Sequence, residues 1–257
     1  MHLLVLALTA FLASGLTLFS GFGLGTILLP VFALYLPVET AVALTAVVHL
    51  SNNVLKLALL GRHADRTVAL RFGLPALFAA LAGAWLLLAL AKAEPLLSWT
   101  LGGRLLHVEP VKLAIGVLMV AFALLELSPR FAEWSVPPRW LPVGGLVAGF
   151  FGGLSGHQGS LRTAFLARSG LGKEAFLATG VVIACVVDVA RLGVYAPSLL
   201  SGRLAGHGLE VAVATGAAFL GVVVATRLLP KVTLKAVRLV VAVALVVLGV
   251  ALGAGLV

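Results

Sequence analysis

Long apolar runs, separated by short stretches that hold most of the charges, dominate the chain. No Asp, Glu, Lys or Arg occurs from Met1 to Val38, and seven further charge-free runs follow. A helix that crosses a membrane needs about 20 mostly apolar residues, and several runs reach that length alone or by including one charge. The pattern predicts eight helical segments, near residues 3–34, 38–60, 68–91, 110–127, 141–167, 174–196, 207–228 and 233–256.

The composition excludes whole classes of protein. Of 257 residues, 61% are hydrophobic and 11% are charged, whereas a soluble domain has about 25% charged residues. Soluble globular, nucleic-acid-binding and disordered chains are therefore excluded, and the missing β-barrel alternation leaves helices. The single cysteine, Cys185, excludes an internal disulfide and a Cys-rich metal site. We predict an all-α, multi-pass protein of the cell inner (plasma) membrane, with the lipid bilayer as a partner and without cofactor, metal or nucleic acid.

An internal repeat predicts the architecture. Shifting the chain by 135 residues aligns Ser20-Gly21 with Ser155-Gly156, Glu39 with Glu174, Ala43 with Ala178, Asn53 with Asp188 and Lys56 with Arg191. The predicted repeats are residues 1–127 and 141–257, joined by a polar, proline-rich loop at 128–140. Duplicated halves are typical of transporters, although chance similarity between apolar helices is an alternative.

Each predicted repeat begins with a segment that glycines interrupt. The interruptions lie at Ser20–Thr26 and Gly152–Ser160. Glycine weakens a helix, and free N–H groups at the start of the following half-helix form an anion site. Packing of small residues between helices is the alternative. The predicted substrate-binding residues of these interruptions are Ser20, Gly21, Gly23, Gly25, Thr26, Ser155, Gly156, His157, Gln158 and Gly159.

The loop charges favour an inverted arrangement of the two repeats. With eight full crossings, the loops on one side of the membrane hold nine Lys and Arg residues and those on the other side hold six. If each interrupted segment folds back, each half crosses three times and the distribution becomes eleven against four. Because cytoplasmic loops carry an excess of Lys and Arg, we predict inverted repeats with both termini outside the cytoplasm.

Polar residues within the predicted spans are the remaining candidates for a site, because an ionisable group there costs about 2.5–3.5 kcal/mol. The second segment can place its polar residues on one broad helical face, and its counterpart carries Asp188 three residues before Arg191. Lys56 could instead extend to the interface, and Asp188 with Arg191 could be a purely internal ion pair. The candidates for substrate binding are His49, Asn52, Asn53 and Thr179, and those for charge or proton coupling are Lys56, Asp188, Arg191 and His157.

Arg162 follows the second interruption and is the leading candidate to bind an oxyanion there. Contact with lipid phosphate is the alternative. His157 could carry a proton or simply form hydrogen bonds. Glu39 and Glu174 each open a predicted helix, where the helix dipole favours a carboxylate.

Three motifs carry a resemblance to a known family. The first motif is Ser-Gly-Phe-Gly-x-Gly-Thr-x-x-x-Pro at Ser20–Pro30, with Ala41-Val42-Ala43-x-Thr45 and Ser51-Asn52-Asn53 after it. The second is Gly149-Phe150-Phe151-Gly152-Gly153-Leu154-Ser155-Gly156. The third is Ala178-Thr179-Gly180. Together they resemble the sulfite exporter family of the TauE/SafE type. The resemblance implies a duplicated membrane protein that moves small sulfur-containing or organic anions, with Ser20–Thr26 and Ser155–Ser160 as facing substrate loops. The chain departs from the family at His157-Gln158, where glycines are usual, and at Phe165, where a proline is usual.

The predicted function is a secondary transporter that exports a small anion such as sulfite or a sulfonate. The chain has no HExxH, GxSxG or Walker motif, so we predict no enzyme. An intramembrane hydrolase using Ser155 and His157 and a passive anion channel are the alternatives. A proton is a possible coupling ion, and the sequence leaves the oligomeric state open.

Overall fold

The helical segments agree with the prediction of an all-α membrane protein. The computed structural model describes residues 2–20, 23–132, 134–200, 205–228 and 234–256. The first half contains α1 (His2–Ser20), α2 (Leu24–Ala33), α3 (Val38–Leu60), α4 (Arg66–Leu90) and α5 (Pro110–Leu127). The second contains α7 (Leu141–Ser155), α8 (Gly159–Leu166), α9 (Lys173–Leu200), α10 (Gly208–Leu228) and α11 (Leu234–Gly253). Short helical turns occur at α6 (Pro129–Ala132), η1 (Gly61–His63), η2 (Pro138–Trp140) and η3 (Ala205–His207).

Among the described residues, five helical stretches are long and apolar enough to cross a membrane. They are Val38–His63, Arg66–Leu90, Pro110–Leu127, Lys173–Pro197 and Gly208–Ala225. Glu39 and Glu174 lie in the first turns of α3 and α9, as predicted.

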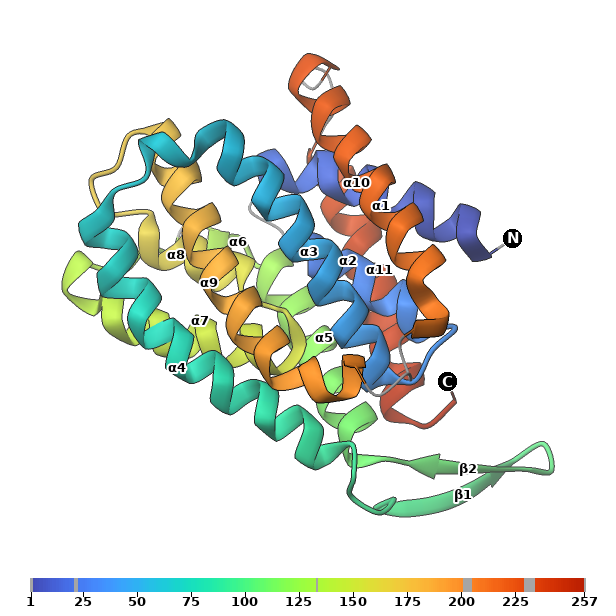
Figure 1. Ribbon diagram of the computed structural model, residues 1–257. Coiled ribbons are helices and arrows are strands. Elements are labelled where there is room, and N and C mark those ends of the chain that lie inside the picture. Colours follow the sequence, from blue (N-terminus) through green and yellow to red (C-terminus); the bar gives the residue numbers. More distant parts are fainter. Residues whose placement is uncertain (1, 21–22, 133, 201–204, 229–233, 257) are drawn as a thin grey trace.

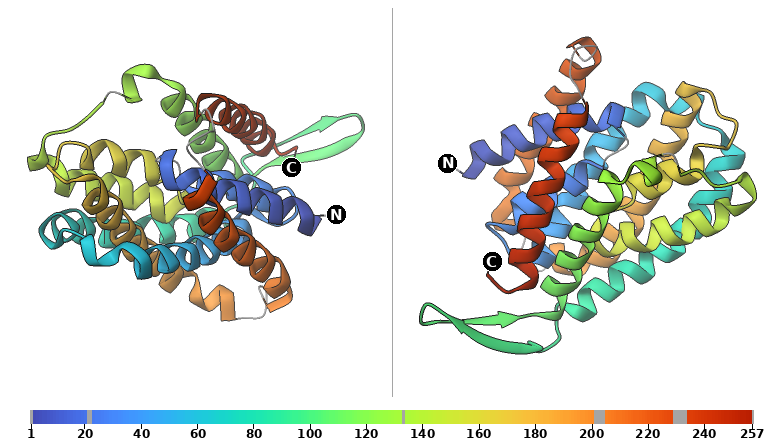
Figure 2. Two further views of the ribbon diagram at one scale, coloured as in Figure 1. Left: turned by 90° about the horizontal axis from the view of Figure 1, so that it is seen from above. Right: turned by 180° about the vertical axis from the view of Figure 1, so that it is seen from behind.

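Both interrupted segments fold back on themselves. The ring of His2, at the start of α1, lies 5.9 Å from the ring of Tyr35, just after α2. In the second half, the backbone N–H of Val136 donates to the carbonyl of Ala164 at 3.4 Å, so α8 ends beside the approach to α7. Figures 1 and 2 show α8 returning along α7. Neither segment therefore continues across as one long helix.

Gly156 makes the second reversal possible. Its φ of 82° is in the left-handed region, which glycine adopts at little cost. Its N–H caps α7 by donating to the carbonyl of Gly152, and α8 begins at Gly159. In the first half, Gly23 is extended and precedes α2, whereas residues 21 and 22 lie outside the described part.

Glycines on α7 also serve helix packing, which was the alternative interpretation of these residues. A Cβ atom at Gly145, Gly149 or Gly153 would meet the backbone of α4 directly. Their four-residue spacing forms one face of α7, and the absence of side chains allows the two backbones to approach closely. The second glycine-rich stretch therefore combines a packing face, which includes Gly153, with a turn at Gly156.

The helix contacts have a paired pattern. α7 packs on α4 and α1 packs on α10, while α9 contacts α4 and α3 contacts α10. α3 also packs on α9 and α5 on α11, and the predicted repeats would make the members of each pair equivalent.

One connection contains the only strands of the described residues, which the prediction of an all-α fold did not include. β1 (Leu97–Leu101) and β2 (Arg104–Val108) form an antiparallel hairpin between α4 and α5. The turn residues Gly102 and Gly103 have φ values of 57° and 80°, as the two-residue turns of hairpins require. This Gly-Gly pair between two short β-prone stretches was the signal that could have revealed the hairpin.

Candidate functional site

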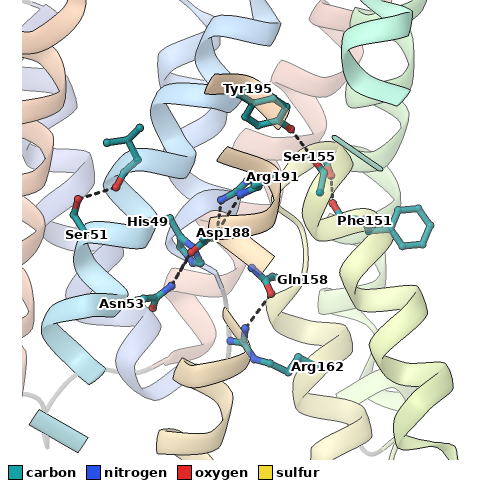
Figure 3. Close-up of polar contacts among 12 residues, drawn as sticks. His49, Ser51, Asn53, Phe151, Ser155, Gln158, Arg162, Asp188, Arg191 and Tyr195 are labelled. Atoms are coloured by element: carbon teal, nitrogen blue, oxygen red, sulfur yellow. Dashed lines mark hydrogen bonds and ion pairs between the residues drawn. The ribbon is translucent and has the colours of Figure 1, made fainter. Parts of the chain in front are cut away.

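Buried polar side chains from both halves meet where α3 and α9 pack together. α3 contributes His49, Asn52, Asn53 and Lys56, and α9 contributes Asp188 and Arg191. The reversal between α7 and α8 reaches this region and adds further polar groups, as Figure 3 shows. The structure thus brings together most of the described candidates that the sequence predicted.

Asp188 is the centre of this cluster. Its Oδ2 atom accepts from His49 Nδ1 at 2.6 Å and from Asn53 Nδ2 at 3.1 Å. Its Oδ1 atom accepts from Nε and Nη2 of Arg191 at 3.0 and 2.7 Å. The side chains of Asp188 and Arg191 are completely buried. A buried carboxylate needs such charged and hydrogen-bonded partners. The predicted internal ion pair of Asp188 with Arg191 exists, and the hydrogen bonds of Asp188 to His49 and Asn53 connect the two halves.

Asn53 and Asp188 occupy equivalent positions in the predicted repeats, 135 residues apart, and they are hydrogen-bonded to each other. Two equivalent residues can touch only near the axis that relates their halves. One turn further along each helix lie the equivalent cations, Lys56 and Arg191. The second half supplies a carboxylate three residues before its cation, whereas the first half has an amide there.

Lys56 is 7% exposed, Arg162, on α8, is half-buried, and the two positive charges repel each other. No Asp or Glu oxygen lies within ion-pairing distance of either cation in the described part of the chain. Arg162 Nη1 donates to Gln158 Oε1 at 3.3 Å. Gly180 on α9 leaves room for the guanidinium, since a Cβ atom there would lie 3.5 Å from Arg162 Nε. Two cations from different halves thus share a region in which no described acid forms an ion pair with either of them, although Asp188 is close enough to attract Arg162.

Several buried donors nearby lack a partner among the described atoms. They include Arg191 Nη1 and Gln158 Nε2, together with Asn52 Nδ2. Arg191 Nη1 faces the turn, because a Cβ atom at Gly156 would lie 2.9 Å from it. Unpartnered buried donors cost about 1–3 kcal/mol each, so their accumulation is a reason to expect a ligand.

His157 and Ser155 interact at the second turn, where His157 Nδ1 lies 2.9 Å from Ser155 Oγ. The hydroxyl of Ser155 donates to the carbonyl of Phe151, and the ring of His157 stacks on Phe122 at a centroid distance of 5.2 Å. No described carboxylate forms a hydrogen bond with His157. The pair therefore lacks the orienting acid of a catalytic triad.

The first interruption is only partly described. Gly25 faces the second turn, because a Cβ atom there would lie 3.6 Å from the carbonyl oxygen of Gly156. Thr26 is buried at the start of α2. The predicted site residue Gly21 and the side chain of Ser20 lie outside the described residues.

Thr179 lies in a different setting from the Asp188 cluster. Its Oγ1 atom accepts from the backbone N–H of Asp65 at 2.9 Å, and Asp65 in turn caps α4 by accepting from the N–H of Val68. Thr179 therefore joins the N-terminal end of α4 to α9. Gly159 begins α8, as the prediction of a half-helix after the break requires.

Two contributors were not predicted as site residues. Ser14 Oγ on α1 donates to Asn52 Oδ1 at 2.9 Å, and Tyr195 Oη on α9 donates to the carbonyl of Gly153 at 2.6 Å. Tyr195 lies four residues after Arg191, on the same helical face, and this spacing could have identified it. Ser14 had no comparable signal, because its partner lies 38 residues away.

The described residues contain no group of three or more His, Cys, Asp or Glu side chains placed to hold a metal ion. Comparison with protein families gives one match, to the model described as "Sulfite exporter TauE/SafE", over residues 6–252. No curated protein and no solved structure matches the chain.

Proposed function

Because the chain belongs to the TauE/SafE sulfite exporter family, we propose that it is a secondary transporter that exports a small sulfur-containing or organic anion. The family match extends over both halves of the chain. Sulfite or a sulfonate is the proposed substrate. The proposed site lies between the two interrupted segments, in the region of Lys56, Arg162 and Arg191.

The observation that carries this proposal is a pair of cations, Lys56, which is buried, and Arg162, which is half-buried, with which no acid of the described residues forms an ion pair. Two like charges removed from water destabilise a protein, because each loses hydration and they repel each other. A bound anion reverses both effects, since its oxygens can accept from both cations at once. Asp188 already neutralises Arg191, so the remaining positive charge is available to the substrate.

The comparison of the halves indicates where the anion binds. Arg191 has Asp188 three residues before it, whereas Lys56 has Asn53 at the equivalent position. We propose that the substrate supplies the negative charge that the first half lacks. The unpartnered donors Gln158 Nε2 and Arg191 Nη1 would complete its hydrogen bonds.

The paired helix contacts support an arrangement of residues 1–127 and 141–257 as inverted repeats, with residues 128–140 as the connection. In this proposal, the two folded-back segments point towards each other, and each half can rock against the other around the fixed site. His157 is a possible carrier of a coupling proton.

Thermal stabilisation of the purified protein by sulfite, sulfate, thiosulfate, sulfonates and carboxylates tests the anion site directly. Loss of one charge-assisted hydrogen bond costs about 1.5–3 kcal/mol, or roughly 10- to 150-fold in affinity. Arg162→Gln should weaken anion binding by that factor. Arg168→Gln, which removes an exposed cation just after α8, is the matched control and should bind like the parent protein. Unchanged affinity in a folded Arg162→Gln protein would remove Arg162 from the site.

Flux into proteoliposomes separates a carrier from the passive anion channel. A carrier should show flux that saturates with anion concentration and responds to a proton gradient if protons are coupled. Flux that rises linearly without saturation would favour the channel instead. Conversion of a substrate to a new product would favour the hydrolase.

A further inference from the structure

The β1–β2 hairpin presents one mainly apolar face. Its register places Leu97 opposite Val108, Trp99 opposite Leu106 and Leu101 opposite Arg104. Side chains alternate along a strand, and directly opposite residues share a face. We call the set Leu97, Trp99, Leu101, Leu106 and Val108 the hairpin apolar face. The other face carries Ser98, Thr100 and His107 beside one leucine, Leu105.

The hairpin lies at the level where membrane spans end. It connects the end of α4 at Leu90 with the start of α5 at Pro110, and both helices are candidate spans. Figures 1 and 2 show it extending sideways from the helix bundle, close to the C-terminal end of α11. Strands of five residues reach about 15 Å, so the turn at Gly102 and Gly103 lies about that far from the helix ends that the hairpin connects.

One hydrogen bond orients the hairpin. The indole Nε1 of Trp99 donates to the carbonyl of Ala254, just after α11, at 3.0 Å. The face that contains Trp99 is therefore turned towards the end of a membrane helix, and the face with Ser98, Thr100 and His107 is turned away.

The hairpin apolar face is only partly covered. Leu97 and Leu101 are each 54% exposed, whereas Val108 near the helices is buried. An isolated two-stranded hairpin is marginally stable in water, and exposed leucines add to that instability. In the headgroup region of a bilayer the hairpin is no longer surrounded by water and its leucines are covered, because this region buries apolar side chains and favours Trp. Arg104, at the turn, can bind lipid phosphate from there.

We propose that the hairpin apolar face lies on the bilayer surface and anchors the α4–α5 connection among the lipid headgroups. The occupant is lipid rather than a second copy of the chain, because the hairpin joins two candidate spans, α4 and α5, and α4 carries an exposed Trp85 close to the end at which the hairpin begins, where membrane spans favour Trp. Trp99 then joins the anchored hairpin to the end of α11. This inference does not depend on which anion the protein carries.

Single cysteines test the proposal in a Cys185→Ala protein. Leu101→Cys lies on the hairpin apolar face, and Thr100→Cys, the adjacent residue on the opposite face, is the matched control. Each is labelled with an environment-sensitive fluorophore in vesicles of equal phosphatidylcholine and phosphatidylglycerol. We expect a blue-shifted label at 101 that quencher-bearing lipids quench, and a label at 100 that aqueous iodide quenches more strongly.

Two results would overturn the proposal. One is a label at 101 that iodide quenches as strongly as the label at 100, with no quenching by lipid. The other is efficient disulfide cross-linking of two Leu101→Cys chains in vesicles, which would assign the face to a second copy. Because both positions are on the exposed hairpin, neither substitution alters the helix bundle of the Cys185→Ala parent.

Discussion

Exchanging Asn53 and Asp188, which occupy equivalent positions in the predicted repeats, gives the most direct test of the buried ion pair. Asp188 and Asn53 touch each other across the contact between the halves. Asp188→Asn removes the only carboxylate hydrogen-bonded to Arg191 among the described residues. The double variant Asp188→Asn/Asn53→Asp returns a carboxylate to the same contact, but on α3 instead of α9.

The single change should be severe. Asp188 accepts four hydrogen bonds, from His49, Asn53 and twice from Arg191. An amide there keeps one acceptor and turns an NH₂ group towards existing donors. Removing one partner from a buried ion pair costs about 3–5 kcal/mol, because the other charge remains buried. We therefore expect Asp188→Asn to lose that much unfolding free energy.

The exchange should recover part of the loss. An Asp at position 53 would lie three residues before Lys56, the same spacing that joins Asp188 to Arg191, and within reach of His49. A hydrogen bond to a charged group contributes about 1.5–3 kcal/mol, so we expect a coupling of about that size between the two changes. Unfolding by denaturant in detergent micelles measures the four proteins of this double-mutant cycle.

Glu174→Gln is the control, because it removes an exposed carboxylate from the same helix. Its side chain is 74% exposed and lies 3.5 Å from His63, so its loss should change stability by about 0.5 kcal/mol or less. Two outcomes would refute the reasoning: a loss below about 1 kcal/mol for Asp188→Asn, or a double variant with no coupling. The first would mean that Arg191 does not depend on Asp188, and the second that positions 53 and 188 do not share one contact.

Three further predictions concern the site and the topology. Lys56→Met should stabilise the anion-free protein by about 1 kcal/mol or more, because it removes a buried charge that has no ion pair among the described residues. It should also reduce the stabilisation that added anion gives. Thermal unfolding of a less stable anion-free variant would contradict this prediction. Gly156→Ala should abolish transport in proteoliposomes, because the φ of Gly156 is 82° and the new Cβ atom would lie 2.9 Å from Arg191 Nη1. The control Gly216→Ala, whose Cβ atom would meet no atom within 4 Å, should transport normally. Equal flux in the two variants would show that the turn tolerates a side chain. In the Cys185→Ala protein, cysteines at positions 66, 130 and 234 should all react with an impermeant reagent from the cytoplasmic side, and labelling of 234 from the side opposite to 66 would exclude the inverted topology.

The positions of the helices could be predicted from the sequence for a local reason. Apolar runs of spanning length are bounded by charges such as Arg66, Lys173 and Glu174, and in a membrane an apolar run must satisfy its backbone within a helix. The hairpin was not predicted although its signal is also local, because the Gly102-Gly103 turn joins strands of only five residues each. The ion pair of Asp188 with Arg191 was within reach of the sequence, since three residues on a helix bring two side chains together.

Tertiary structure decided everything that depends on distant residues. Gly156 permits a reversal of the chain, but the packing of Gly145, Gly149 and Gly153 on α4 gives α7 its direction. His49 lies 139 residues from Asp188 in the sequence, and only the contact between α3 and α9 brings them to 2.6 Å. The same contact leaves Lys56 buried without an ion pair to any described acid, because Asn53 has an amide where Asp188 has a carboxylate. Local sequence thus determined which segments are helical and which residues are charged, whereas long-range packing determined which charges are neutralised.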